Sequence, residues 1–97
     1  MNARTLYECM GFEQMRAEDT NEPVHFTIEL DGGPMAQGFI YPDGGMSMNL
    51  MGGVYTRLYF NELGVEDEYI YMYFKTQNRT EYIGMIACEE ITNFKVD

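Results

Sequence analysis

Basic residues are scarce in this chain of 97 residues, where six Lys and Arg stand against 16 Asp and Glu for a formal net charge of −10. A nucleic-acid-binding surface needs cationic side chains that displace counterions from phosphates, and an anionic membrane surface makes the same demand. We therefore expect no direct nucleic-acid binding and no membrane association. The acidity either keeps a small protein soluble or complements a basic partner, and both interpretations stand at this point.

Cysteine occurs twice, at Cys9 and Cys88, and the only histidine is His25. Disulfide-dependent secreted domains of this size carry more cysteines, and zinc sites need ligands at short spacings such as C-x-x-C. A lone histidine on the polar side of a strand is typical of a surface residue. We expect two reduced thiols, no metal site and no cofactor. The chain also lacks a signal peptide and a membrane-length apolar run, which favours a cytoplasmic protein.

No combination of residues typical of an active site stands out. The turns Asp31-Gly32-Gly33 and Asp43-Gly44-Gly45 lack the lysine and following helix of a phosphate-binding loop, so they predict hairpin turns. With so many acids, some carboxylates lie close by chance, and their proximity identifies no general acid or base. We therefore expect a protein that is not an enzyme.

Helical signals are confined to the N-terminal region. Thr5 and Glu8 have the spacing of a capping box, in which each side chain binds the other's backbone amide. The helix that follows either continues to about Glu18 or ends near Gly11, and we favour the longer form.

From Val24 onward, apolar and polar residues alternate in short runs separated by Gly-rich turns, the pattern of strands with one buried face. The acidic connection from Asn61 to Asp67 could contain a single helical turn that ends at Gly64. The predicted strands are 24–30, 35–41, 46–50, 54–60, 69–75 and 82–88, and 91–96 forms either a further short strand or an irregular tail.

Because no crossover helix separates these strands, we predict a single α+β domain over residues 1–97. Its N-terminal helix is followed by a curved antiparallel meander sheet of about six short strands. The apolar face of that sheet is covered by the helix, or it is enclosed where the sheet curls into a small half-open barrel.

The stretch from Glu68 to Cys88 predicts a hairpin with two different faces. A loop with an even number of residues keeps the apolar side chains of both strands on one side, whereas an odd loop mixes the two faces. The even loop predicts three buried pairs across the hairpin: Phe74 with Ile83, Met72 with Met85, and Ile70 with Ala87.

The other side of this hairpin carries tyrosine at alternate positions. These rings either pack against the helix or a barrel wall, or form a partner surface, for which tyrosine is a favoured residue. A third interpretation is a platform on which a nucleotide or another planar ligand stacks. The candidate binding surface consists of Tyr69, Tyr71 and Tyr73, the lateral residues Tyr55 and Tyr59, and the acidic run Glu66, Asp67 and Glu68.

These observations predict a non-enzymatic acidic binding protein, an inhibitor or adaptor that occupies a basic groove on a protein partner. Phage-encoded inhibitors of host defence are proteins of this general description, which is an analogy of type and not of motifs. Two alternatives stand beside this function. One is a binder or sponge for a nucleotide-like ligand held between the Gly-rich turns and the tyrosines. The other is a self-assembling subunit, including a homodimer through the sheet face or edge.

Overall fold

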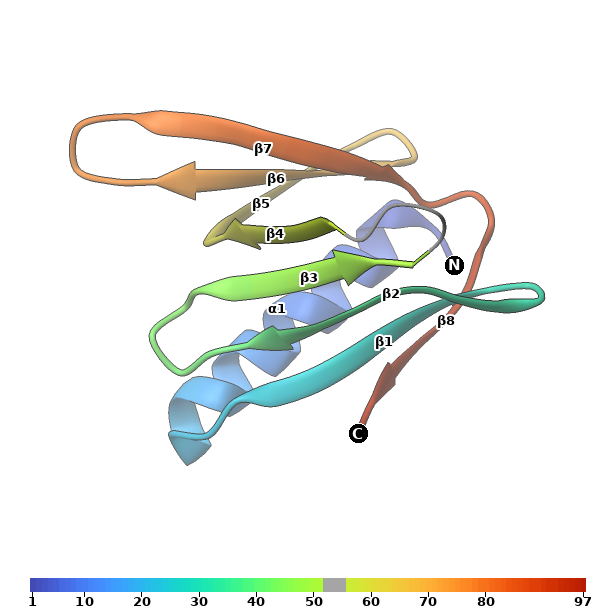
Figure 1. The fold of residues 1–97 in the computed structure, drawn as a ribbon, viewed down its shortest axis with the longest axis horizontal. Coiled ribbons are helices and arrows are strands. Elements are labelled where there is room, and N and C mark those ends of the chain that lie inside the picture. Colours follow the sequence, from blue (N-terminus) through green and yellow to red (C-terminus); the bar gives the residue numbers. More distant parts are fainter. Residues whose placement is uncertain (52–55) are drawn as a thin grey trace.

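The computed structural model describes residues 1–51 and 56–97, and Figure 1 shows their arrangement. The described residues form one helix and eight strands, with antiparallel pairing throughout. The elements are α1 (Ala3–Thr20), β1 (Val24–Leu30), β2 (Gly33–Ile40), β3 (Met46–Leu50), β4 (Thr56–Phe60), β5 (Glu62–Glu66), β6 (Tyr69–Lys75), β7 (Thr80–Ala87) and β8 (Ile91–Val96). This is the predicted α+β fold.

The strands form two sheets, not the single sheet of about six strands that was expected. Sheet 1 has the order β4-β3-β2-β1-β8, and sheet 2 has the order β5-β6-β7. Helix α1 lies across one face of sheet 1, and sheet 2 lies beyond β4, which packs against β6 and β7 (Figure 1). In the described part of the chain neither sheet closes on itself.

The core lies between α1 and the inner faces of both sheets. Strand β1 follows the predicted alternation at Val24, Phe26 and Ile28, which are buried, whereas Thr27 is buried as well and Leu30 is only partly buried. The largest completely or almost completely buried side chains are Phe26, Phe60, Leu6, Met10, Ile28, Ile40, Met46, Met48, Ile70, Met72, Ile91 and Cys88. Methionine is abundant in this set, as expected for a core that must fill irregular space between a helix and two sheets.

Helix α1 begins earlier than the predicted capping box. The Asn2 side-chain oxygen accepts the Thr5 backbone N–H at 2.8 Å, which makes Asn2 the N-cap. The capping box at Thr5 and Glu8 is therefore wrong, because Asn2 supplies an acceptor one turn earlier. The longer form of the helix is confirmed: it runs to Thr20 and ends at Asn21, whose φ of 55° is left-handed.

Asn61 is the single residue that connects β4 of sheet 1 to β5 of sheet 2. Its backbone N–H donates to the Tyr73 carbonyl at 2.9 Å, and its side-chain amide both donates to and accepts from the Lys75 backbone, at 2.9 and 2.8 Å. The β5–β6 ladder therefore starts at the bend itself. The helical turn predicted within Asn61–Asp67 is wrong, because those residues pair with β6 as strand β5.

The register of the β6–β7 hairpin differs from the predicted one. Ile70 pairs with Ile86 and Met72 with Gly84, each one residue away from its predicted partner. Ile83 has no opposing residue, because the register shifts there by one residue in a β-bulge. Beyond the bulge, the side chains of β7 that a regular hairpin would direct inward point outward, and those that it would direct outward point inward.

Two consequences of this register concern the core. Met85 and Ala87 point outward, and the buried positions near the end of the strand are Ile86 and Cys88. Phe74 pairs with Glu81 near the β6–β7 turn, which projects past the end of β4 (Figure 1), and it is 39% exposed. The expected burial of Phe74 is wrong, because this end of the hairpin extends beyond β4, the strand that packs against β6 and β7.

Phe26 and Phe74 provide a matched test of these burial differences. We expect Phe26→Ala to lower the free energy of unfolding by about 3–5 kcal/mol, the cost of removing a buried aromatic side chain. Phe74→Ala should cost about 1 kcal/mol or less, because its ring is largely outside the core. Denaturant unfolding of both variants measures the difference, and equal losses would contradict the exposed position of Phe74.

Two glycines provide a second matched pair. A Cβ at Gly38 would lie 2.0 Å from the Ser47 carbonyl oxygen and 2.9 Å from Phe26 Cζ, whereas a Cβ at Gly11 meets nothing within 4 Å. Gly38→Ala should therefore lose about 1–3 kcal/mol or more of stability. Gly11→Ala should gain about 0.5–1 kcal/mol by favouring the helix. Thermal and denaturant unfolding measure both variants, and a neutral Gly38→Ala would refute the close approach of β3 and the Phe26 ring to Gly38.

Candidate functional site

The outward face of sheet 2 brings most of the predicted binding residues together. The pairing aligns its side chains in three rows across the strands: Glu62–Tyr73–Tyr82, Gly64–Tyr71–Met85 and Glu66–Tyr69–Ala87. Opposed residues in antiparallel strands point to the same side. Ile70 and Met72 occupy the alternate positions of β6 and are buried in the core, so the tyrosines point away from it. We call the surface formed by Tyr69, Tyr71, Tyr73, Tyr82 and Met85 the tyrosine face.

The rings of the tyrosine face support one another while leaving surface to solvent. Ring centroids are 6.4 Å apart for Tyr69 and Tyr71, 6.5 Å for Tyr71 and Tyr82, and 5.9 Å for Tyr73 and Tyr82. Tyr82 is 55% and Met85 52% exposed, while Tyr71 and Tyr73 are half-buried. These exposures show that no element of residues 1–51 and 56–97 forms a second packed layer over this face.

Gly64 makes room for one of these rings. A Cβ at Gly64 would lie 3.4 Å from Tyr73 Cε2 and 4.0 Å from Tyr71 Cβ, so the Tyr73 ring extends over the glycine backbone. The neighbouring outward positions on β5 are both acidic, at Glu62 and Glu66. The edge of the tyrosine face along β5 therefore alternates carboxylate, glycine and carboxylate.

One end of the tyrosine face is strongly acidic. The β5–β6 turn lies beside the β7–β8 connection, because the Cys88 N–H donates to the Glu68 carbonyl at 2.8 Å. Asp67 adopts a left-handed φ of 54° in this turn. Within the described residues none of the side chains gathered here forms an ion pair. We call this group the acidic end, and its members are Glu66, Asp67, Glu68, Glu89 and Glu90.

The opposite end of sheet 2 carries cations that are already paired. Lys75 Nζ lies 3.9 Å from a Glu62 carboxylate oxygen, and an Arg79 guanidinium nitrogen lies 3.6 Å from Glu81. All four side chains are substantially exposed, so each pair contributes little to stability. Their arrangement still gives the face a charge gradient, from the mixed hairpin tip to the acidic end.

The two predicted lateral tyrosines do not extend this cluster. Tyr55 lies outside the described residues, and Tyr59 lies on β4, opposite Ser47 on the outward face of sheet 1. The Tyr59 ring has the Arg57 guanidinium over it at 6.0 Å and makes no ring contact with the tyrosine face among the described residues.

Tyr82 and Met85 take the lateral positions instead, and the sequence analysis did not name them as site residues. The predicted hairpin register already set Tyr82 opposite Lys75, on the tyrosine side, so that signal was available. Met85 could not be found in this way, because only the bulge at Ile83 brings it to the outward face.

The tyrosine face and the acidic end interact electrostatically. The pKa of the Tyr71 hydroxyl is raised above its ordinary value of 10.0, first by partial burial among its neighbours and second by the negative charge of Glu66. Tyr82, Tyr69 and Tyr73 raise this pKa further. The raised pKa extends to more alkaline pH the range in which the Tyr71 hydroxyl is a protonated hydrogen-bond donor.

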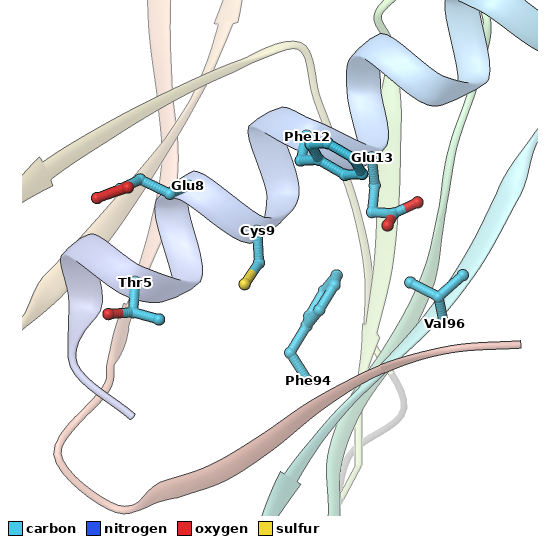
Figure 2. Close-up of a pocket in the computed structure, with 7 residues that line it drawn as sticks. All are labelled: Thr5, Glu8, Cys9, Phe12, Glu13, Phe94 and Val96. Atoms are coloured by element: carbon cyan, nitrogen blue, oxygen red, sulfur yellow. The ribbon is translucent and has the colours of Figure 1, made fainter.

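A second concave surface lies between α1 and the edge strand β8. It has a volume of about 440 Å³, within the range of ligand pockets. Figure 2 shows the Cys9 sulfur pointing from α1 towards Phe94, while the Glu8 carboxylate is directed away from Phe94 and Val96. Glu13 lies 3.2 Å from Arg16 and is already paired. The lining residues are Thr5, Glu8, Cys9, Phe12, Glu13, Phe94 and Val96.

The remaining candidate side chains are His25 and the two cysteines. His25 Nδ1 lies 2.5 Å from an Asp97 carboxylate oxygen, and its ring packs beside Phe39. Cys9 and Cys88 are free thiols, and burial raises the pKa of the Cys88 thiol. Across residues 1–51 and 56–97, no three potential metal ligands cluster, and no helix has the length and apolarity to cross a membrane.

The chain matches no protein-family model, and comparisons with curated proteins and with solved structures also found no match.

The electrostatic link between Glu66 and Tyr71 can be tested by titration. Glu66→Gln should lower the pKa of Tyr71 but leave it above its ordinary value, because partial burial is the larger cause. NMR of the tyrosine ring carbons at alkaline pH measures this directly. Glu81→Gln is the control and should leave the Tyr71 pKa unchanged. An unchanged pKa in Glu66→Gln would place that carboxylate away from Tyr71.

The same shift predicts the direction of alkaline destabilisation. Because the folded protein holds the Tyr71 proton more tightly than the unfolded chain, this group's contribution to stability is complete below the ordinary pKa. It is lost as pH rises from there through the raised pKa.

Proposed function

We propose that this protein is a stoichiometric binding protein of the inhibitor or adaptor type, which docks its tyrosine face and acidic end onto a basic surface of a partner protein. One observation carries the proposal. A cluster of mutually contacting, partly exposed tyrosines adjoins carboxylates that no cation pairs among the described residues. This combination fits a protein interface better than it fits a solvated sheet surface.

The tyrosine face is suited to hold a partner. Tyrosine buries a large apolar ring and presents a hydroxyl, and it loses little conformational freedom on binding. The ring contacts among Tyr69, Tyr71, Tyr73 and Tyr82 restrict these side chains before a partner arrives. Binding therefore costs less side-chain entropy than it would for isolated exposed rings. Met85, beside Tyr71, adds an adaptable apolar contact.

The negative charge of the protein favours a partner with a basic surface. A net charge of −10 attracts basic surfaces over a distance, and the unpaired acidic end concentrates that field beside the tyrosines. The same charge opposes association between two copies of the chain. It equally opposes binding of a phosphate-bearing ligand at this face.

The geometry of the Gly-rich turns gives less support to the nucleotide-like ligand. The turn at Asp31 and Gly32 lies at one end of β2, and the turn at Asp43 and Gly44 lies at the other. The second turn borders Asn61, Glu62 and Lys75 at the hairpin-tip end of sheet 2, whereas Asp31 of the first turn lies beside Glu89 and Glu90 at the other end. One small molecule therefore reaches at most one of these turns together with the tyrosines.

The two parts of the surface should affect binding kinetics differently. The double variant Glu66→Lys, Asp67→Lys should slow association with the partner and weaken its dependence on salt, because rim charges steer encounter. Tyr71→Ala should speed dissociation by about 30-fold, the equivalent of about 2 kcal/mol for a central hot spot. Stopped-flow or surface-based kinetics at two salt concentrations measures both effects.

Tyr59→Ala is the matched control, because Tyr59 is an exposed tyrosine on the other sheet. It should change neither rate. An affinity that is indifferent to salt, to Tyr71→Ala and to the charge reversal would mean that the partner binds another surface, and the groove between α1 and β8 would be examined next.

A further inference from the structure

Resting on the proposed function, we propose that the tyrosine face contains a seat for one arginine side chain of the partner. The guanidinium would lie against the rings of Tyr69 and Tyr71 and pair with the Glu66 carboxylate. This assigns a ligand chemistry to one position of the surface and makes the arginine the anchor of the complex.

The pairing of β5 with β6 brings the three groups together. Glu66 is directly opposite Tyr69, and its diagonal neighbour on the same side is Tyr71. Diagonal neighbours in an antiparallel pair are about 7–8 Å apart, within reach of long side chains. The Glu66 charge also raises the pKa of Tyr71, as this proximity requires. Gly64 adds no side chain of its own between Glu62 and Glu66.

Glu66 is the carboxylate of this sheet face that lacks a cation. Glu62 has Lys75 at 3.9 Å, and at the hairpin tip Glu81 has Arg79 at 3.6 Å. Glu66 has no such partner among the described residues. Glu62 and Glu81 each have a cation nearby, and a cation supplied by a partner protein would give Glu66 the same kind of contact.

Arginine fits this position better than lysine. Its planar guanidinium can stack on an aromatic ring while its N–H groups donate to a carboxylate, whereas lysine presents a compact and strongly hydrated charge. The protein contains its own example on sheet 1, where the Arg57 guanidinium lies over the Tyr59 ring at 6.0 Å. A stacked, charge-assisted contact of this kind gives specificity in addition to attraction.

The seat can be tested without the partner, using N-acetyl-arginine amide as the probe. Aromatic NMR spectra should show saturable shifts at the Tyr69 and Tyr71 rings, with millimolar affinity for so small a ligand. N-acetyl-citrulline amide has nearly the same shape without the charge and should cause no saturable shift. N-acetyl-lysine amide should bind more weakly. The Tyr59 ring on sheet 1 should not follow the arginine titration.

Variants then locate the seat. Glu66→Gln, an exposed and conservative change, should weaken binding of the arginine probe by roughly threefold or more. Glu81→Gln should leave it unchanged. Saturable binding of citrulline equal to that of arginine, lysine binding as tight as arginine, or equal effects of the two glutamate changes would each overturn the proposal.

Measurements on the partner complex separate this inference from the proposed function. If Tyr71→Ala speeds dissociation of the partner but Glu66→Gln alters neither probe nor partner binding, the arginine seat is wrong and the binding surface stands. If the arginine probe binds as expected but Tyr71→Ala leaves partner kinetics unchanged, the seat stands and the proposed docking surface is wrong.

Discussion

The hydrogen bonds of Asn61 to β6 are the constraint on which the rest of the structure depends. The chain leaves sheet 1 after Phe60 and enters sheet 2 at Glu62, so a single residue must turn the strand without losing its pairing. Asn61 does so with its own backbone N–H and with a side-chain amide that replaces a backbone pair opposite Lys75. These bonds set the register of β5, and that register puts Glu66 opposite Tyr69.

The bulge at Ile83 makes a second contribution, on the other side of β6. A regular hairpin would have directed Met85 and Ala87 into the core, with Ile86 outside. The shifted register buries Ile86 and Cys88 against Ile70, and it adds Met85 to the outward surface beside Tyr71. A local irregularity of one residue thus improves the core and widens the tyrosine face together. Bulges often re-aim side chains in this way where a surface has a role.

The charge distribution connects this architecture to binding. Gathering Glu66, Asp67, Glu68 and the neighbouring Glu89 and Glu90 at one end of the molecule costs stability through repulsion between like charges. The described residues offer no ion pairs to offset that cost there, although the chain uses its few cations for pairs elsewhere. A basic partner surface would relieve the repulsion, which is the physical reason why we favour an interface at this end.

The sequence by itself determined which side chains share a face of a strand, where the Gly-rich turns fall and that one N-terminal helix precedes the strands. These features depend on neighbours within a few residues, and the alternation in Val24–Leu30 and around Ile70 and Met72 carries them. Only the tertiary structure decided how β5, β6 and β7 align with one another, and that these three strands form a separate second sheet. Strand β5 exists because β6 pairs with it, and the exposure of Phe74 follows from the projection of the β6–β7 turn past β4. Met85 joins the surface, and Tyr59 does not, because two sheets and a bulge set directions that no local pattern encodes.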